Sequence, residues 1–293
     1  MFEQLGLIGC GLMGGSFALA LKKAGLVKRV VGYSKSPSTT ESARQMGIID
    51  VGAPSALLAV SGADLVVIAV PVSASEATLR SIKQLVTPNM LIMDVGSTKR
   101  EVVDAARAAL GERVGSFVPA HPITGREVSG IEHANADLYT GRQVILTPTE
   151  RTLTAQLDKA VAMWGALGCG VQQMSPDAHD AAFASVSHLP HLLAFALISS
   201  ISSQEKGREF LTLAGPGFRD FTRIAASDPI IWRDIMMTNR RELLAQTDLF
   251  KRTLAQLESM ILSGNGDALE EVLKLASKAR TRWHMTSHKP PKH

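Results

Sequence analysis

The chain has only two cysteines among its 293 residues, Cys10 and Cys169. Two cysteines are too few for a disulfide framework and show no metal-ligand spacing, so we expect both to be small, reduced core residues. Long hydrophobic runs are missing too, because runs such as residues 65–70 and 91–95 are too short to cross a bilayer, and Met1 leads almost directly into a strand pattern. These absences predict a cytoplasmic protein that does not bind a membrane.

Aromatic residues are scarce as well, with two tyrosines and three tryptophans. The formal net charge is +4, but the lysines and arginines are spread among acids, which argues against a nucleic-acid groove. Part of the positive excess lies in the tail, residues 286–293, which we expect to be disordered. The remaining composition is that of a globular protein long enough for two domains, and its basic balance suits a site for anions.

A strand, glycine and helix pattern opens the chain and then repeats. Residues 4–8 have the pattern of a buried strand, three glycines follow, and residues 16–24 have helical spacing. Six further strand-like runs alternate with helical stretches, at residues 29–33, 65–70, 91–95, 117–120, 143–147 and 170–174. This alternation predicts an α/β domain over residues 1–173, built on a Rossmann-type, mostly parallel, doubly wound sheet.

The pattern changes after Pro176, because no further strand-like run follows and apolar residues recur at helical spacing. We therefore predict a second, all-helical domain over residues 174–285. One expected helix carries an apolar stripe, which fits either the domain core or a subunit interface. The stripe consists of Leu243, Leu244, Phe250, Leu254, Leu257 and Ile261.

The first motif with chemical content is the pattern Gly-x-Gly-x-x-Gly at residues 9–14. Its glycines allow a tight turn, a close approach of backbone to pyrophosphate, and close packing of helix on strand, while N–H groups at the helix start bind the phosphates. The alternative is a turn with a purely structural role. The expected dinucleotide site comprises Gly9, Gly11, Leu12, Met13 and Gly14, with Val70 and Pro71 at the end of a later strand.

The end of the second strand indicates which dinucleotide binds. NAD-specific domains usually place an Asp or Glu there, which accepts hydrogen bonds from the ribose 2′-hydroxyl. This chain has Ser34, Lys35 and Ser36 instead, which offer hydroxyl donors and a cation to a 2′-phosphate. The sequence therefore predicts NADP as the preferred cofactor and leaves NAD open. The alternative is that Lys35 is a solvated loop residue.

Two segments that follow strands carry candidates for catalysis, Ser97 within residues 94–99 and His121 within residues 119–125. In an open α/β sheet the ligand crevice lies outside the carboxyl ends of the strands, so both side chains are expected near the nicotinamide. A histidine there can take a hydroxyl proton near neutral pH while hydride leaves the same carbon, and Ser97 can orient both partners. A histidine before a proline fits a turn residue bonded to the backbone equally well.

The predicted helical domain contains two histidines, His188 and His191, near an expected helix start. They can face one side of the helix, but no Asp, Glu or Cys lies at accompanying ligand spacing, so we expect no metal. Binding of an anionic substrate fits them better, and a capped helix start is the structural alternative. Arg219 and Arg223 lie one helical turn apart, and arginine is the natural partner of a carboxylate. For Arg219, a surface salt bridge shared with Asp220 is the alternative.

Together these segments resemble the prephenate/arogenate (cyclohexadienyl) dehydrogenase family over nearly the whole chain, apart from the tail. The resemblance rests on the glycine motif, residues 94–99, His121-Pro122 with Gly125 and Glu127, residues 187–191, and residues 220–225 with Asp228-Pro229 and Trp232. It implies oxidative decarboxylation of prephenate, arogenate or both in tyrosine biosynthesis, with hydride transfer to NADP or NAD. The product would be 4-hydroxyphenylpyruvate or tyrosine. With the apolar stripe, it also implies a homodimer formed through a helical dimerisation domain.

The resemblance also implies roles for single residues. His121 corresponds to the base at the ring C4 hydroxyl, and Ser97 to its hydrogen-bonding partner. His191 corresponds to a substrate ligand, with His188 a weaker candidate, and Arg223 to the arginine that binds a substrate carboxylate. The remaining candidates border the substrate pocket, and they are Glu127, Trp232 and Arg219. The turn that contains Arg219 differs from other members, so the choice between the keto group of prephenate and the amino group of arogenate stays open.

Two other functions are alternatives. A β-hydroxyacid dehydrogenase has a similar glycine motif and a helical second domain, but its helix-borne catalytic lysine has no counterpart in a suitable setting within residues 160–175. A non-catalytic, NADP-sensing protein would keep the fold and would need none of the four side chains Ser97, His121, His191 and Arg223. The combined presence of these four favours the enzyme.

Overall fold

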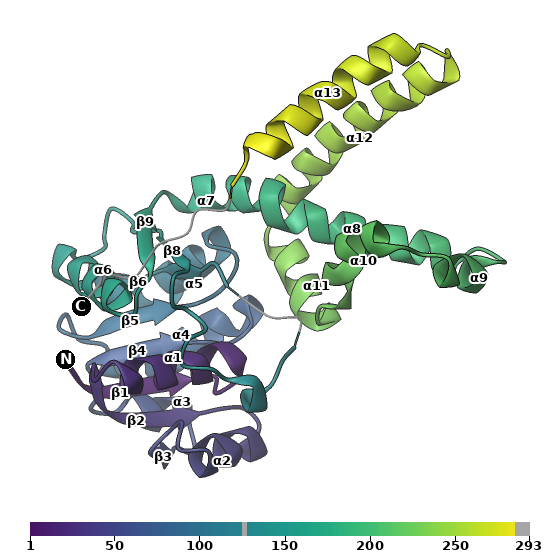
Figure 1. Cartoon of the computed structure of the whole chain (residues 1–293). Coiled ribbons are helices and arrows are strands. Elements are labelled where there is room, and N and C mark those ends of the chain that lie inside the picture. The colour runs from purple at the N-terminus through teal and green to yellow at the C-terminus, as the bar shows by residue number, and fades with distance from the viewer. Residues whose placement is uncertain (125–127, 285–293) are drawn as a thin grey trace.

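The computed structural model of the protein describes residues 1–124 and 128–284. A domain that contains all the strands is followed by a helical domain, from which a pair of long helices projects (Figure 1). The tail that we expected to be disordered, residues 286–293, lies outside the described residues.

Six parallel strands form the main sheet, in the order β3-β2-β1-β4-β5-β6. They are β1 (Phe2–Ile8), β2 (Val27–Tyr33), β3 (Val51–Gly52), β4 (Leu65–Ile68), β5 (Leu91–Asp94) and β6 (Phe117–Val118). All residues of β4 and β5 are buried, as expected for parallel strands covered on both faces. The strand order reverses between β1 and β4, and in such sheets the ligand crevice lies at the carboxyl ends of the strands there.

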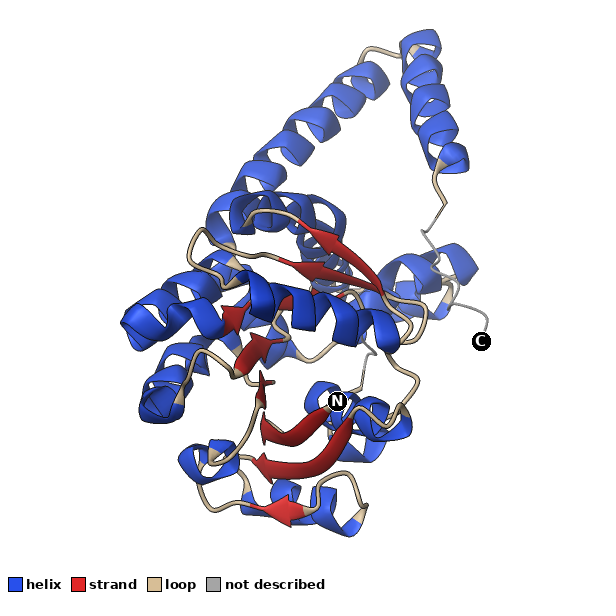
Figure 2. Ribbon diagram, turned by 90° about the vertical axis from the view of Figure 1, so that its left-hand side faces the viewer, coloured by secondary structure: helices blue, strands red, loops and turns tan. Residues whose placement is uncertain are grey.

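Helices pack on both faces of this sheet (Figure 2). They are α1 (Leu12–Lys23), α2 (Pro37–Gln45), α3 (Ala56–Val60), α4 (Ser75–Ile82), α5 (Arg100–Leu110) and α6 (Thr154–Ala166), with 3-10 turns η1 (Val72–Ala74), η2 (Lys83–Leu85), η3 (Gly111–Ser116) and η4 (Ile131–His133). The core beside α1 contains three packed rings, with the Phe17 centroid 5.1 Å from that of Trp164 and 6.2 Å from that of Tyr139. The predicted Rossmann-type α/β class is therefore confirmed.

The prediction that all seven strand-like runs belong to one sheet is wrong. A second sheet contains β7 (Ala120–Pro122), β8 (Gln143–Leu146) and β9 (Gly170–Gln173), with β7 antiparallel to β8. The run at 117–120 is divided at Pro119, which has no N–H to donate to a ladder. Beyond it the chain leaves the parallel sheet, and the N–H of Ala120 donates instead to the side chain of Asp94 at 3.1 Å.

A buried ion pair joins β7 to the end of β5. The ammonium of Lys99, a fully buried residue, pairs with Asp94 and donates to the carbonyl oxygen of Ala120 at 2.8 Å. The Asp94 carboxylate also accepts from the N–H of Gly96 at 2.8 Å. Both charges are therefore hydrogen-bonded, which such a pair requires away from water. The pair holds the loop after β5 against the residue that precedes His121.

The described part of the chain after β9 contains no strand, so the second domain is all helical, as predicted. Its elements are α7 (Pro176–Phe183), η5 (Ala184–His188), α8 (Leu189–Ser202), α9 (Gly207–Thr212), α10 (Pro216–Thr222), η6 (Arg223–Ala226), α11 (Pro229–Thr238), α12 (Arg240–Leu262) and α13 (Gly266–Arg282). The expected helix start near residue 188 is wrong, because η5 is a π-helical turn that joins α7 to α8 in one continuous run. Pro190 follows this turn, where a regular helix would lose a hydrogen bond.

The helical domain exposes much apolar surface within the single chain. In the predicted stripe Leu243 is buried, whereas Leu244, Phe250, Leu254 and Ile261 are exposed, which favours the interface over the core. The expectation that the apolar runs are too short to cross a bilayer is wrong for Pro176–Ser202, which is long and apolar enough by length and composition alone, and only 17% of its most apolar window is buried in the chain. Neither apolar surface is therefore covered within the single chain.

Candidate active site

The glycine loop follows β1 at the point where the strand order reverses, and its glycines differ in what surrounds them. Gly9 has φ +99°, and a Cβ there would lie 2.2 Å from the carbonyl oxygen of Ala69. A Cβ at Gly14 would lie 2.0 Å from the carbonyl oxygen of Gly9, so the helix and the strand end are in close contact. A Cβ at Gly11 would meet nothing within 4 Å. The open space therefore lies beside Gly11, where a pyrophosphate needs it.

Neighbouring groups hold the start of α1 in place. Gly11 is the N-cap of α1 and offers no capping side chain, so the first-turn N–H groups, including those of Leu12 and Met13, remain for a ligand. The buried Tyr139 donates its hydroxyl to the carbonyl oxygen of Met13 at 2.7 Å. Val70 and Pro71 follow directly after Ala69, the residue in contact with Gly9. The predicted cofactor residues of both segments thus lie at one edge of the sheet.

The end of β2 is tied to the glycine loop. Ser34 Oγ accepts a hydrogen bond from the N–H of Cys10 at 2.8 Å, which leaves the hydroxyl proton of Ser34 for another acceptor. Ser36 caps α2, with Oγ accepting from the N–H of Thr39 at 3.5 Å, and Lys35 between them is exposed. The predicted 2′-phosphate residues therefore surround the start of a second helix.

Gly11 and Gly14 form a matched pair for testing this site. Gly11→Ala is expected to fold with unchanged stability and to weaken NADP or NAD binding by about tenfold or more, because the methyl group enters the open space. Gly14→Ala is expected to lower the free energy of unfolding by at least about 2 kcal/mol, because its methyl group meets backbone. Denaturant titration and cofactor titration of both variants measure the two effects. Equal losses of stability would contradict this assignment.

His121 lies in β7 and is buried. Its Nδ1 lies 2.8 Å from Nε2 of His179 in α7, so the imidazole is bonded to a side chain and not to a turn of the backbone. The Phe183 ring packs on both, with centroids 4.8 Å from His121 and 4.4 Å from His179. Burial, and then His179, Lys99 and His188, lower the pKa of His121 well below 6.5. A neutral imidazole at pH 7 follows, which can act as a base.

His179 contacts its chain neighbour Asp180, with Nδ1 2.8 Å from Oδ1, and both residues are fully buried. The Asp180 carboxylate also accepts from the N–H of Lys99 at 2.8 Å and of Arg100 at 2.9 Å. Burial raises the pKa of Asp180, but the hydrogen bonds from His179 and from these N–H groups outweigh it and hold the pKa below its ordinary value. Burial lowers the pKa of His179, against the opposing effect of Asp180. An anionic carboxylate thus lies beside a neutral imidazole.

Ser97 lies on the loop that the Asp94–Lys99 pair holds against β7. Its side chain is half-buried and makes no hydrogen bond to the described residues. The structure therefore brings the segments of the two predicted catalytic residues together and leaves the Ser97 hydroxyl for a ligand.

His188 and His191 both face Trp232 of α11. The ring of His191 stacks on that of Trp232 with centroids 3.4 Å apart, and the His188 ring meets it edge-on at 6.2 Å. Burial lowers the pKa of His188 to about 4 and also lowers that of His191. Nδ1 of His188 lies 3.1 Å from Nδ2 of Asn239, and its Nε2 is buried without a partner among the described residues. The expectation that both histidines face one side is confirmed.

Two hydrogen bonds join α11 to loops of the main sheet. The hydroxyls of Thr98 and Thr238 lie 3.0 Å apart, and Ser73 Oγ donates to Oδ2 of Asp234 at 2.9 Å. Both loops follow strands at the carboxyl edge, and α11 also carries Trp232. Trp232 is therefore held at a fixed place relative to the cofactor crevice.

The two predicted arginines lie on exposed elements of the helical domain. Arg219 forms an ion pair with Asp220 at 3.0 Å, and both side chains are exposed, as the alternative of a surface salt bridge expects. Arg223 begins η6, which packs against α8, the helix that contains His191. Glu127 lies outside the described residues.

His179, Asp180 and Asn239 were not predicted from the sequence. Neighbouring residues in a helix point about 100° apart, so an adjacent His and Asp give no sign of a mutual hydrogen bond. The partners of Asp180 are 80 and 81 residues away in the chain. The signal that did exist was a histidine and a carboxylate at the start of the helix that follows the domain boundary.

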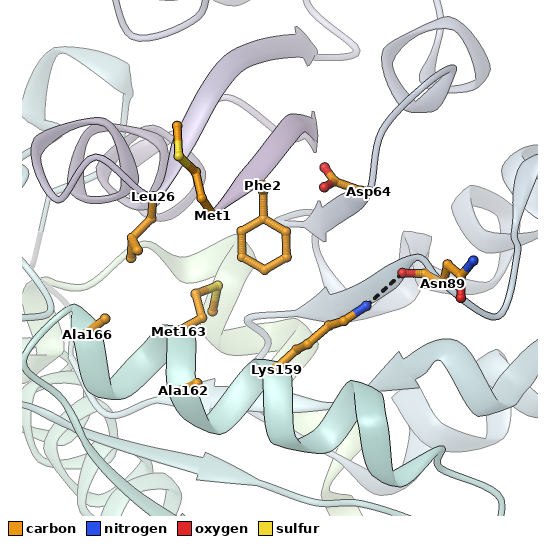
Figure 3. Close-up of a pocket in the computed structure, with 9 residues that line it drawn as sticks. All are labelled: Met1, Phe2, Leu26, Asp64, Asn89, Lys159, Ala162, Met163 and Ala166. Carbon is orange, nitrogen blue, oxygen red and sulfur yellow. Dashed lines mark hydrogen bonds between the residues drawn. The ribbon is translucent and has the colours of Figure 1, made fainter.

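The pocket in Figure 3 is not this site. It has a volume of about 620 Å³ and is lined by Met1, Phe2, Leu26, Asp64, Asn89, Lys159, Ala162, Met163 and Ala166. Phe2 begins β1, whereas the glycine loop follows the other end of that strand. None of the predicted site residues lines it. Among the residues that the structure describes, we also find no group of three or more His, Cys, Asp or Glu side chains placed to hold a metal ion.

Two family models match the chain. The model described as "Prephenate dehydrogenase, nucleotide-binding domain" matches residues 17–173. The model described as "Prephenate dehydrogenase, dimerization domain" matches residues 175–275. Together they match most of both domains of the structure.

Individual proteins agree with these matches. The chain is 34% identical to the cyclohexadienyl dehydrogenase of Zymomonas mobilis, over 96% of each chain. A crystal structure of Aquifex aeolicus prephenate dehydrogenase with hydroxyphenyl propionate and NAD+ is 36% identical, with a TM-score of 0.89 over 96% of this chain and 98% of that one. Synechocystis arogenate dehydrogenase is 27% identical, with a TM-score of 0.81 over 96% of this chain and 100% of that one.

Proposed function

Since the chain belongs to the prephenate dehydrogenase family, we propose that it oxidatively decarboxylates prephenate, arogenate or both in tyrosine biosynthesis. The products are 4-hydroxyphenylpyruvate from prephenate and tyrosine from arogenate. The observation that carries this proposal is the buried His121, which burial keeps neutral at the carboxyl edge of the sheet. A base of this kind is needed where a hydroxyl loses its proton as hydride leaves.

Each side chain of the site has a separate role in this reaction. A nicotinamide, when bound at the glycine loop, would supply the hydride acceptor. His121 takes the proton of the ring C4 hydroxyl, and Ser97 donates a hydrogen bond that orients this hydroxyl. His191, stacked on Trp232, fixes the position of the ring, with His188 behind it. Loss of the ring carboxylate as carbon dioxide makes the ring aromatic, so the protein needs to supply orientation and a neutral base.

The anionic end of the substrate needs a cation. We propose Arg223 for this role, because it lies in η6 against the helix of His191 and guanidinium groups bind carboxylates with two hydrogen bonds. Arg219 and Glu127 remain candidates for the mouth of the pocket. Arg219 forms an exposed ion pair with Asp220.

We further propose that NADP is preferred over NAD. The end of β2 carries no carboxylate at residues 34–36, and Lys35 is exposed beside the hydroxyls of Ser34 and Ser36. Those groups suit a 2′-phosphate, whereas a bare ribose gains nothing from Lys35. The glycine loop accepts either dinucleotide.

Initial rates with prephenate and arogenate, each with NAD and NADP, test the substrate and the cofactor together. We expect turnover mainly with NADP, and the faster substrate identifies the enzyme. Lys35→Ala is expected to lower kcat/KM for NADP about tenfold and to leave that for NAD unchanged, because it removes one charged hydrogen bond. No turnover in any of the four combinations, with cofactor still bound, would reject the function. Equal rates with both cofactors would reject the preference alone.

His121→Asn is expected to abolish turnover and to leave cofactor binding intact, because it removes the base without touching the glycine loop.

The pH dependence of the wild-type kcat/KM provides a second measurement of the role of His121. Because the pKa of His121 is lowered, the base stays neutral and activity stays constant down to pH 6.5, and it falls only below that pH. A decline that begins above pH 6.5 would show that another group is the base.

We propose that the chain forms a homodimer through the helical domain. The exposed stripe of α12 and the weakly buried run Pro176–Ser202 lie in the part matched by the dimerization model. The run also contains His179 and Asp180, which bond to each other, and His188, whose Nδ1 contacts Asn239, so we assign its apolar surface to a second copy and not to lipid. A cytoplasmic location, without membrane or nucleic-acid partners, goes with this proposal.

Light scattering after size exclusion, without detergent, is expected to give twice the chain mass. The double variant Leu254→Lys and Ile261→Lys is expected to be monomeric, because two charges would lose their water in an apolar interface. Gln256→Lys, also exposed on α12, adds charge outside the stripe and serves as the control. A monomeric wild type, or a dimer that survives both lysines, would show that this surface does not join the subunits.

A further inference from the structure

We propose that His179 and Asp180 are positioning residues that fix the tautomer of His121, so that its Nε2 carries the lone pair that accepts the substrate proton. The inference rests on the proposed function, because it deepens the role of the base in that reaction. It starts from a chain of two contacts that runs from His121 through His179 to Asp180.

The far end of this chain is a carboxylate with fixed charge and fixed direction. Asp180 accepts two backbone N–H groups, from Lys99 and Arg100, and its own carbonyl oxygen accepts from Nδ2 of Asn239 at 2.8 Å. These bonds come from the start of α5 and from the junction of α11 and α12, so two separate segments hold it. An anion with this many donors cannot donate a proton itself, and it can only accept from His179.

The tautomers of His179 and His121 follow from the charge on Asp180. Nδ1 of His179 must carry a proton to donate to Asp180, and a neutral imidazole has only one, so Nε2 of His179 is an acceptor. The partner of that acceptor is Nδ1 of His121 at 2.8 Å, which must therefore be the protonated nitrogen of His121. What remains on His121 is an unprotonated Nε2. That nitrogen is the basic one.

Surrounding charges support the neutral state of both rings. Lys99, from the loop after β5, lies near His121 and His179, and its charge lowers the pKa of both. Asp180 and Asp94 act in the opposite direction on His179, and burial is the largest effect on each imidazole. His188, from η5, is itself kept neutral by burial. Phe183 stacks on His179, with ring centroids 4.4 Å apart.

The same contacts accommodate the proton once it arrives. When the substrate O–H bond breaks, its proton forms a bond to Nε2 of His121 and the ring becomes an imidazolium. The Nδ1–H group continues to donate to His179, whose acceptor nitrogen is polarised by the hydrogen bond to Asp180. Asp180 thus stabilises the developing charge through His179 without receiving the proton. No electron transfer is involved in this step.

Two substitutions at His179 separate positioning from packing. His179→Leu keeps the side-chain volume and removes the acceptor, and we expect kcat to fall about 100-fold with KM for substrate and cofactor little changed. His179→Gln returns an amide oxygen near the position of Nε2, and we expect it to recover at least tenfold of that loss. His133→Leu, a half-exposed histidine outside the network, controls for the substitution itself.

A spectroscopic measurement reads the tautomer without turnover. Two-bond nitrogen–proton correlation spectra of the full-length protein, labelled with 15N-histidine, are expected to show a protonated Nδ1 and a bare Nε2 for His121, assigned by comparison with His121→Asn. In His179→Leu the spectra are expected to show a mixture of both tautomers.

Each of these measurements can overturn the proposed tautomer or the proposed role of His179. A wild-type His121 with a protonated Nε2 would overturn the proposal, and so would a His179→Leu variant that keeps kcat within about threefold. Equal losses in the Leu and Gln variants, with KM and thermal stability changed in parallel, would assign His179 to packing and also overturn it. If the wild type turns over neither cyclohexadiene, the proposed function fails, and the spectra still test the tautomer.

Discussion

One buried carboxylate, that of Asp94, sets the geometry on which the site depends. It closes the turn after β5 by accepting from Gly96, it holds the ammonium of Lys99, and it receives the N–H of Ala120, where a parallel ladder would have continued. Removing either charge would leave the other buried without its counter-charge, which costs about 3–5 kcal/mol. Because the N–H of Lys99 also binds Asp180, the same short loop fastens the helical domain to the sheet. His121, the loop after β5 and the His179–Asp180 pair are therefore parts of one buried polar network.

Local patterns predicted the parts of the fold that local chemistry determines. The glycine motif, the apolar runs of β1, β2, β4 and β5 and the switch to helical spacing after Pro176 all depend on neighbours in the chain, and each was identified from the sequence. The short, exposed strand β3 was not predicted. The second sheet was not, because a run of residues 117–120 carries no sign that Pro119 sends its two halves to different sheets. The bonds of Asp180 and Asn239 join residues that are 51 to 81 positions apart, and no spacing rule reaches that far.

The residues of the candidate site that are expected to contact a ligand were predicted from the sequence. The residues that only contact other site residues were not. Ser97, His121, His191 and Trp232 were selected for their chemistry and position, and the structure holds the loop of Ser97 against the strand of His121 and stacks His191 on Trp232. Their supports, Lys99, His179 and Asn239, looked like ordinary polar residues. Links such as Ser73 with Asp234 then set the distance between the two domains, which no feature of either domain alone defines. The geometry of a site shared between two domains therefore depends on these hydrogen bonds.

The π-helical turn at Ala184–His188 has a consequence for which changes in chain length the protein can tolerate. Such a turn holds one residue more than a regular helix, so deleting a single residue there would let α7 and α8 merge into an unbroken α-helix. The turn would then hold one residue fewer, so α8 would keep its phase and His191 would stay on the face of Trp232. The cost would fall on Pro190, because in a regular helix its ring would meet the carbonyl group four residues before it, at about 3 kcal/mol or more. The wide turn is thus the space that lets a proline lie inside a continuous helix.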